Sequence, residues 1–108
     1  MKVKEIEQGS TNVYQDLGYP DADKMQVKAA LAAKIGDIIK TRRLTQTQAG
    51  EILGITQPKL SAMLRGQFRG ISEAKMIESL NRLGRDVEIV VHKPTRTSKA
   101  GETRVVIA

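Results

Sequence analysis

The side chains of this sequence that are best suited to a definite chemistry lie between residues 43 and 69. Four have the size and polarity to reach the edges of DNA bases: Gln57, Lys59, Ser61 and Ala62. Four others carry amide or guanidinium groups, which bind phosphate oxygens: Gln46, Arg65, Arg69 and Arg43. This stretch therefore predicts contacts to a nucleic acid, with bases read by the first set and phosphates held by the second.

Two short helices joined by a tight turn are expected to position these side chains. The first is predicted over residues 46–53, with Thr45 as its N-cap and Gly54 at its end, where left-handed backbone is favoured. Thr56 is expected to cap the second helix, and Pro58 lies in its first turn, where proline is tolerated. Helix, tight turn and helix indicate a helix-turn-helix, whose second helix enters the major groove.

A long amphipathic helix is predicted before this unit, over residues 22–43, and another after it, between Ser72 and Gly84. The apolar face of the long helix is predicted from its spacing: Val27, Leu31, Ile35, Ile38 and Ile39. The opposite, solvent-facing set is basic and acidic: Lys24, Lys28, Lys34, Asp37 and Lys40. The expected fold class is mainly α, a four- to five-helix domain with a C-terminal β-strand.

That strand is predicted over residues 86–91, because Val87, Ile89 and Val91 alternate with other side chains at a period of two. A single strand needs a partner. Two remain open from the sequence: the same strand in a second subunit, or residues 104–107 of the same chain. The first would make these residues the dimer strand, and a homodimer would supply paired half-sites on DNA.

Composition narrows the classes of protein. The 108 residues include no cysteine, which excludes disulfides and thiolate metal sites and favours a reducing, cytoplasmic location. No apolar run is long enough for a signal peptide or a membrane span, so no membrane association is expected. The net charge is +6, and six basic residues against one acidic residue place +5 of charge between residues 40 and 69. Such a segment attracts a polyanion, although a solvated surface has the same composition.

No catalytic or metal-binding residues are predicted, and no cofactor. The acidic residues of the central region lack metal-ligand spacing, and the single histidine, His92, has no partners for a metal site. An enzyme is therefore not expected. RNA binding stays open, but exposed aromatic pairs for base stacking are missing from the sequence pattern.

The residues from Leu44 to Gly66, LTQTQAGEILGITQPKLSAMLRG, resemble the lambda-repressor-like helix-turn-helix of the xenobiotic-response-element (XRE) family. With the flanking helices the resemblance covers about 65 residues. The segment from Gly9 to Asp21 and the stretch from Leu83 to Val91 further resemble HigA-type antitoxin regulators. The resemblance implies that Gln46 binds phosphate and braces the second helix, and that Gln57 opens that helix and pairs with adenine.

The resemblance also implies roles for the remaining positions and marks two departures. Lys59, Ser61 and Ala62 match exposed recognition positions, with Ala62 suited to a thymine methyl group. From chemistry alone, Lys59 suits a phosphate as well as a base, and Arg43 suits a phosphate or the negative end of a helix dipole. Pro58 replaces a residue that is often polar. Gly50 replaces an alanine, at a cost of about 1 kcal/mol in helix propensity.

Three regions with different roles are expected: an N-terminal arm over residues 1–21, the DNA-binding domain over 22–85, and a strand with a basic tail over 86–108. The predicted function is a sequence-specific repressor of double-stranded DNA, the antitoxin of a toxin–antitoxin pair that regulates its own operon as a dimer. By resemblance, the toxin partner would be a RelE-like ribonuclease. Two alternatives stay open, a stand-alone XRE-family regulator and a protein that chiefly neutralises a toxin.

Overall fold

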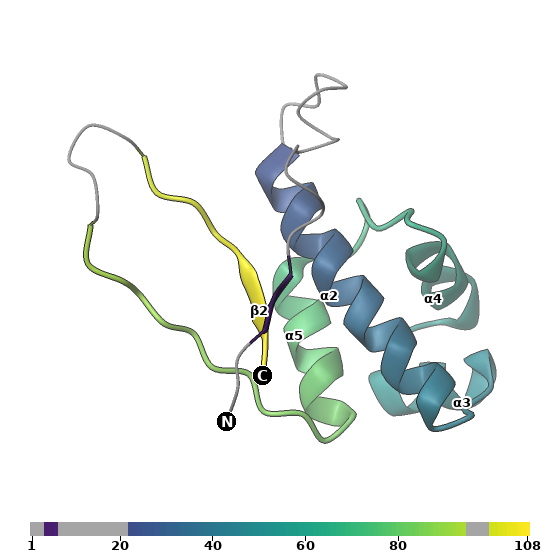
Figure 1. Ribbon diagram of the computed structural model, residues 1–108. Coiled ribbons are helices and arrows are strands. Elements are labelled where there is room, and N and C mark those ends of the chain that lie inside the picture. Colours follow the sequence, from purple (N-terminus) through teal and green to yellow (C-terminus); the bar gives the residue numbers. More distant parts are fainter. Residues whose placement is uncertain (1–3, 7–21, 95–99) are drawn as a thin grey trace.

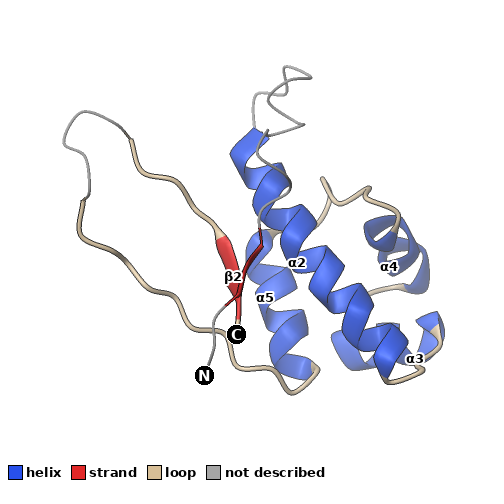
Figure 2. Cartoon of the chain, viewed as in Figure 1, coloured by secondary structure: helices blue, strands red, loops and turns tan. Residues whose placement is uncertain are grey.

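The fold is mainly helical, as the sequence predicts (Figures 1 and 2). The structure, a computed structural model, describes residues 4–6, 22–94 and 100–108. Within them it has four helices, α2 (Ala22–Thr41), α3 (Gln46–Leu53), α4 (Gln57–Leu64) and α5 (Glu73–Arg82), and two strands, β1 (Lys4–Ile6) and β2 (Val105–Ile107). Residues 9–21, on which part of the antitoxin resemblance rests, lie outside the described residues.

The core lies between the four helices and is built from aliphatic and methionine side chains. The largest apolar side chains that are fully buried come from each helix in turn: Ile35, Leu53, Leu60, Met63 and Met76. The predicted apolar face of α2 is confirmed, with four of its five residues buried and Val27 half-buried against the core. Burial of this face against α4 and α5, on which α3 packs in turn, is the main force that orients the helices.

Lys28 corrects the predicted polar face of α2, because it is buried and not on the solvent side (7% exposed). Its Nζ donates hydrogen bonds to the carbonyl oxygens of Phe68 (3.3 Å) and Arg69 (3.5 Å) and lies 3.7 Å from Glu73 Oε1. A buried ammonium is tolerated only when such partners replace water. Lys28 thereby ties the loop after α4 to α2.

The turn between α3 and α4 depends on two glycines. Thr45 caps α3 through a capping box with Gln48, and Gly54 ends the helix in left-handed backbone (φ 67°). The next residue, Ile55, donates its backbone N–H to Gly50 O at 3.0 Å. A Cβ on Gly50 would lie only 2.7 Å from the Ile55 carbonyl oxygen. The turn can therefore pack directly against the backbone of Gly50 only because glycine has no side chain.

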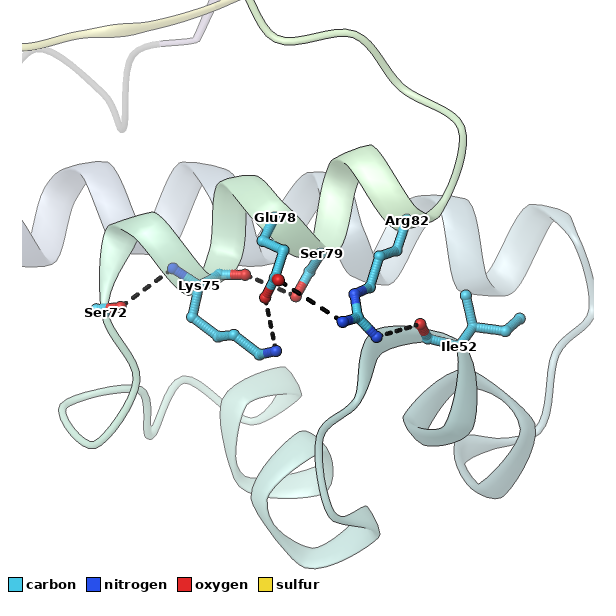
Figure 3. A network of polar contacts seen from close by, with 6 residues as sticks. All are labelled: Ile52, Ser72, Lys75, Glu78, Ser79 and Arg82. Atoms are coloured by element: carbon cyan, nitrogen blue, oxygen red, sulfur yellow. Dashed lines mark hydrogen bonds and ion pairs between the residues drawn. The ribbon is translucent and has the colours of Figure 1, made fainter.

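Helix α5 supports this turn from behind through a small charged network (Figure 3). Arg82 Nη1 donates to the carbonyl oxygen of Ile52 at 3.4 Å, where α3 ends, and its guanidinium covers Gly54. Glu78 lies between two cations, 2.7 Å from Lys75 Nζ and 3.6 Å from Arg82 Nη2. A cation at the C-terminal end of a helix offsets the partial negative charge of its last carbonyl groups.

The C-terminal strand lies at residues 105–107, and this corrects the prediction for residues 86–91. β2 pairs antiparallel with β1, with Glu5 opposite Val106. Residues 85–94 form no strand, so the pairing of Val87, Ile89 and Val91 with residues 104–107 of the same chain is wrong. The reason is competition for a partner, since strand formation needs hydrogen bonds from a neighbour and β1 of the N-terminal arm supplies them to β2.

We expect Gly50→Ala to destabilise the protein, although helix propensity alone favours alanine by about 1 kcal/mol. The added methyl group would meet the Ile55 carbonyl oxygen, and moving the turn should cost about 1–3 kcal/mol. Urea unfolding followed by circular dichroism measures the change. Thr47→Ala, at an exposed position of α3, is the matched control and should raise stability slightly. A Gly50→Ala protein that is more stable than the parent would contradict the close contact.

We expect the contribution of Glu78 to stability to depend on pH. The hydrogen bond from Lys75, then its charge and that of Arg82, hold the pKa of Glu78 below the ordinary 4.5 of a glutamate. A lowered pKa in the folded state stabilises the protein above pH 4.5, and this stabilisation disappears as pH falls through the folded-state value. Glu78→Gln should therefore lower Tm at pH 6 and lower it less at pH 3. Glu51→Gln on α3 is the control, and an equal Tm difference at both pH values would contradict the network.

Candidate nucleic-acid interface

The α3–α4 unit lies on one side of α2, and the β1–β2 pair lies on the other (Figure 1). The turn between the two helices comprises residues 54–56, which brings the N-terminal ends of α3 and α4 close together. The first three residues of each helix are exposed, Gln46 to Gln48 in α3 and Gln57 to Lys59 in α4. The predicted helix, tight turn and helix are confirmed.

Two glutamines, one at the first residue of each helix, are joined by a hydrogen bond. Gln57 Nε2 donates to Gln46 Oε1 at 2.8 Å, and both side chains are exposed. This arrangement uses one N–H of the Gln57 amide and leaves its second N–H and its carbonyl oxygen open. Those two groups are the pair that can bind the N7 and N6 positions of an adenine. Gln46 keeps its own NH2 group, which suits a phosphate oxygen.

The predicted base-contacting residues lie along α4, with different exposures. Leu60 and Met63 are buried and fasten the helix to the core. Gln57 and Lys59 are exposed in the first turn, while Ser61 and Ala62 are half-buried in the second. The four residues are thus on one short helix, but Gln57 and Lys59 extend furthest from the protein.

Ser61 and Arg65 form a pair one turn apart on α4. Arg65 Nη1 donates to Ser61 Oγ at 2.7 Å, and Arg65 itself is the C-cap residue. The bond directs the guanidinium along the helix and leaves most of its five donors open, which is enough to bind a phosphate. The serine hydroxyl keeps its own hydrogen for donation. The predicted base contact and the predicted phosphate contact therefore belong to one hydrogen-bonded unit.

Two other predicted phosphate contacts, Arg69 and Arg43, lie in the connections before and after the unit. Arg69 is exposed in the loop between α4 and α5, and Lys28 binds its carbonyl oxygen. Arg43 is exposed between α2 and α3 in left-handed backbone (φ 55°), a conformation that costs a side chain about 1–2 kcal/mol. This backbone reverses the chain three residues before Gln46.

Thr56 corrects a detail of the prediction. It occupies the expected N-cap position of α4, but its side chain makes no capping hydrogen bond. A cap accepts from the second or third helical N–H, and the second helical residue is Pro58, which has none. The start of α4 is therefore held by the turn and by the Gln46–Gln57 pair.

The sequence did not predict the side chains that bind the backbone of the α3–α4 unit and hold it against the other helices. In the sequence, Lys28 and Arg82 cannot be distinguished from solvated charges, because their carbonyl partners lie in other elements. The signals in the sequence for the network around Glu78 are the i, i+3 spacing of Lys75 and Glu78 and the i, i+4 spacing of Glu78 and Arg82.

The charge of the region suits a polyanion. Between residues 40 and 69 the chain carries six basic side chains and one acidic side chain, Glu51. All six basic side chains are exposed: Lys40, Arg42, Arg43, Lys59, Arg65 and Arg69. Arg69 also makes an interaction within the protein. In the part of the chain that the structure describes, no three acidic, histidine or cysteine side chains could hold a metal ion together. Nor is any helix there both long and apolar enough to cross a membrane.

The predicted dimer strand is separate from this surface. Val87 (36% exposed), Ile89 (77%) and Val91 (92%) lie in the segment that leaves α5 on the side of the β strands (Figure 1). They contribute nothing to the α3–α4 surface. The structure therefore divides the predicted site residues into two groups on different sides of the molecule.

Comparison with known proteins agrees with this geometry. The family model of a helix-turn-helix domain matches residues 13–92. One solved structure, whose name assigns it to the XRE family of transcriptional regulators, is 40% identical and superposes with a TM-score of 0.75. The alignment covers 82% of this chain and all of that one. No curated protein matches.

The match therefore spans the helix-turn-helix together with the helices before and after it. The solved structure is similar to this chain both in its fold and in its sequence. The chain belongs to the XRE-like helix-turn-helix family, a family of DNA-binding transcriptional regulators.

Proposed function

We propose that this protein is a sequence-specific repressor that binds a two-fold symmetric operator as a homodimer. The observation that carries the proposal is the bond between Gln57 and Gln46 at the exposed start of α4. It holds a base-reading amide in one orientation on a basic surface. Ordering a side chain before binding reduces the entropy lost in the complex.

In this proposal α4 lies in the major groove with its N-terminal turn nearest the bases. Gln57 reads adenine through its remaining N–H and its carbonyl oxygen, and Lys59 and Ser61 contact neighbouring bases. Gln46, Arg65, Arg69 and Arg43 bind phosphates on either side of the groove. Arg43 lies before α3 and Gln46 is its first residue, while Arg65 follows α4 and Arg69 lies in the loop after it, so phosphate contacts are proposed at both ends of the α3–α4 unit.

The homodimer is proposed to form through residues 86–92. Val87, Ile89 and Val91 are exposed, as is Val90 between them, and in the described part of the chain no strand pairs with this apolar segment. An apolar edge of this kind favours pairing with another chain. Because the strip lies away from α3 and α4, a second copy bound there leaves both recognition helices open to DNA.

We propose further that the protein is the antitoxin of a toxin–antitoxin pair and represses its own operon. This rests on the resemblance of its sequence to HigA-type regulators, by which the toxin would be a RelE-like ribonuclease. The alternative is a stand-alone regulator. A neighbouring reading frame for a small basic protein distinguishes the two, and footprinting of the upstream DNA with and without that product tests whether it changes repression.

The base-reading role of Gln57 is tested with two substitutions. Gln57→Ala should weaken operator binding by about 1–3 kcal/mol and relax preference at one base pair, with little change on random DNA. Arg65→Ala should weaken binding to all sequences and reduce the slope of log affinity against log salt by about one. Fluorescence anisotropy on the footprinted operator and on a scrambled duplex measures both.

Gln46→Ala serves as a further comparison in the same assay. It leaves the amide of Gln57 intact but removes the bond that orients it, so specificity should fall while the affinity for random DNA falls only by one phosphate contact. Equal losses on operator and random DNA for Gln57→Ala would exclude base reading by this residue.

The dimer strand is tested with Ile89→Lys and Val91→Lys in one protein. Lysine on an edge strand opposes pairing, so light scattering should report a monomer, and operator affinity should fall about a hundredfold through loss of the second half-site. Point changes are preferred to deletion of residues 86–108, because Val105 packs against the core. Ala74→Lys, exposed on α5, is the control. A double variant that stays dimeric places the interface elsewhere.

A further inference from the structure

The outward face of α4 has an apolar centre. Pro58 is exposed, and Ala62, four residues later on the same face, is half-buried. Leu60 and Met63, on the opposite side of the helix, are buried. The side chains that point directly away from the protein are thus a pyrrolidine ring and a methyl group. Neither can form a hydrogen bond.

Apart from the exposed Lys59, the polar side chains beside this strip are already bonded within the protein. On one side Gln57 donates to Gln46, and Ser61 accepts from Arg65. These bonds keep both polar groups at the border of the strip and away from its centre. A ligand that approaches α4 head-on therefore meets apolar surface first, with hydrogen-bonding groups along its edge.

The surroundings of the strip indicate what covers it. The exposed cations Lys59, Arg65 and Arg43 lie on α4 or in the turn before α3, and the stretch from residue 40 to residue 69 has a net charge of +5. An apolar protein partner would leave these cations without counter-charges. DNA supplies phosphates for them, and its major groove presents one exposed apolar substituent, the C5 methyl group of thymine.

We propose that Pro58 reads a thymine methyl group next to the one that the resemblance already implies for Ala62, so that the two residues form one methyl-reading strip. The Cβ atoms of residues four apart on a helix are separated by about 5–6 Å, which spans one to two base-pair steps of about 3.4 Å. Each half-site then carries two thymine methyls near the base that Gln57 reads. This proposal rests on the proposed DNA-binding function, and it assigns to Pro58 a specificity role in place of the polar contact that the position commonly makes.

The test removes single methyl groups from the DNA. An operator is first selected from random duplexes with the full-length protein, and each thymine is then replaced in turn by deoxyuridine, which keeps every hydrogen-bonding group of the base. At two positions in each half-site the affinity should fall about fourfold, the value expected for one buried methyl group. The same replacements in a scrambled duplex should change nothing.

A substitution at Pro58 tests whether this residue contacts one of the two methyl groups. Pro58→Ser should lose the response to deoxyuridine at one of the two positions and keep it at the other, because serine presents no comparable apolar surface. Lys59→Ser, in the same helical turn, is the matched control, and it should bind more weakly but keep both responses. Circular dichroism verifies that each variant is folded, and the scan with the unaltered protein does not depend on any variant.

The outcomes separate this inference from the proposed function. Failure to select any preferred duplex would overturn the proposed function itself. A preferred duplex that tolerates deoxyuridine at every position would overturn the methyl-reading strip and leave sequence-specific binding intact. A Pro58→Ser protein that keeps both responses would show that the methyl groups are read by other residues.

Discussion

The direction of α4 depends on an approach between two helices in which no side chain intervenes. Gly50 faces the carbonyl oxygen of Ile55 at a distance that a Cβ could not occupy, and Gly54 reverses the chain in left-handed backbone. The N-terminal ends of α3 and α4 can then come so close that their first side chains, Gln46 and Gln57, share a hydrogen bond. The orientation of the Gln57 amide, for which we propose base reading, thus follows from a missing methyl group.

The basic residues of this protein perform two different tasks, and net charge cannot distinguish them. Lys28 and Arg82 each bind backbone carbonyl oxygens, at the loop after α4 and at the end of α3. Lys28 connects the loop after α4 to α2, and Arg82 connects the end of α3 to α5. Lys59 and Arg65, on α4, are exposed and remain available for phosphates. Excess positive charge therefore both supports the binding surface and forms part of it.

The two sides of the molecule differ in how much apolar surface they leave exposed to solvent. On the α3–α4 side Gln57 is bonded to Gln46 and Arg65 to Ser61, and the apolar side chains of both helices largely pack into the core. On the other side Ile89 and Val91 expose most of their surface and pair with nothing in the described residues. A folded domain seldom leaves such a strip uncovered, because apolar exposure costs roughly 25 cal/mol for each Å². This contrast motivates our assignment of DNA to one side and a second chain to the other.

Helix spacing, caps and turn residues in the sequence predicted all four described helices, because these signals are local and act within a few residues. The residue types of the α4 surface were predictable for the same reason, since Leu60 and Met63 mark the buried side and leave the others outside. The strand was misplaced because alternation indicates an extended chain but does not name its partner. β1, about a hundred residues from β2, supplied that partner.

What the sequence determined by itself is therefore the order of the helices, the helix-turn-helix and the identity of the side chains on α4. Only the tertiary structure decided that Lys28 is buried, that Arg82 covers the end of α3, that Gln57 is bonded to Gln46 and that Gly50 has no room for a methyl group. Each of these depends on atoms from two elements that meet in space. A periodic pattern describes one element at a time and holds no information about such distances.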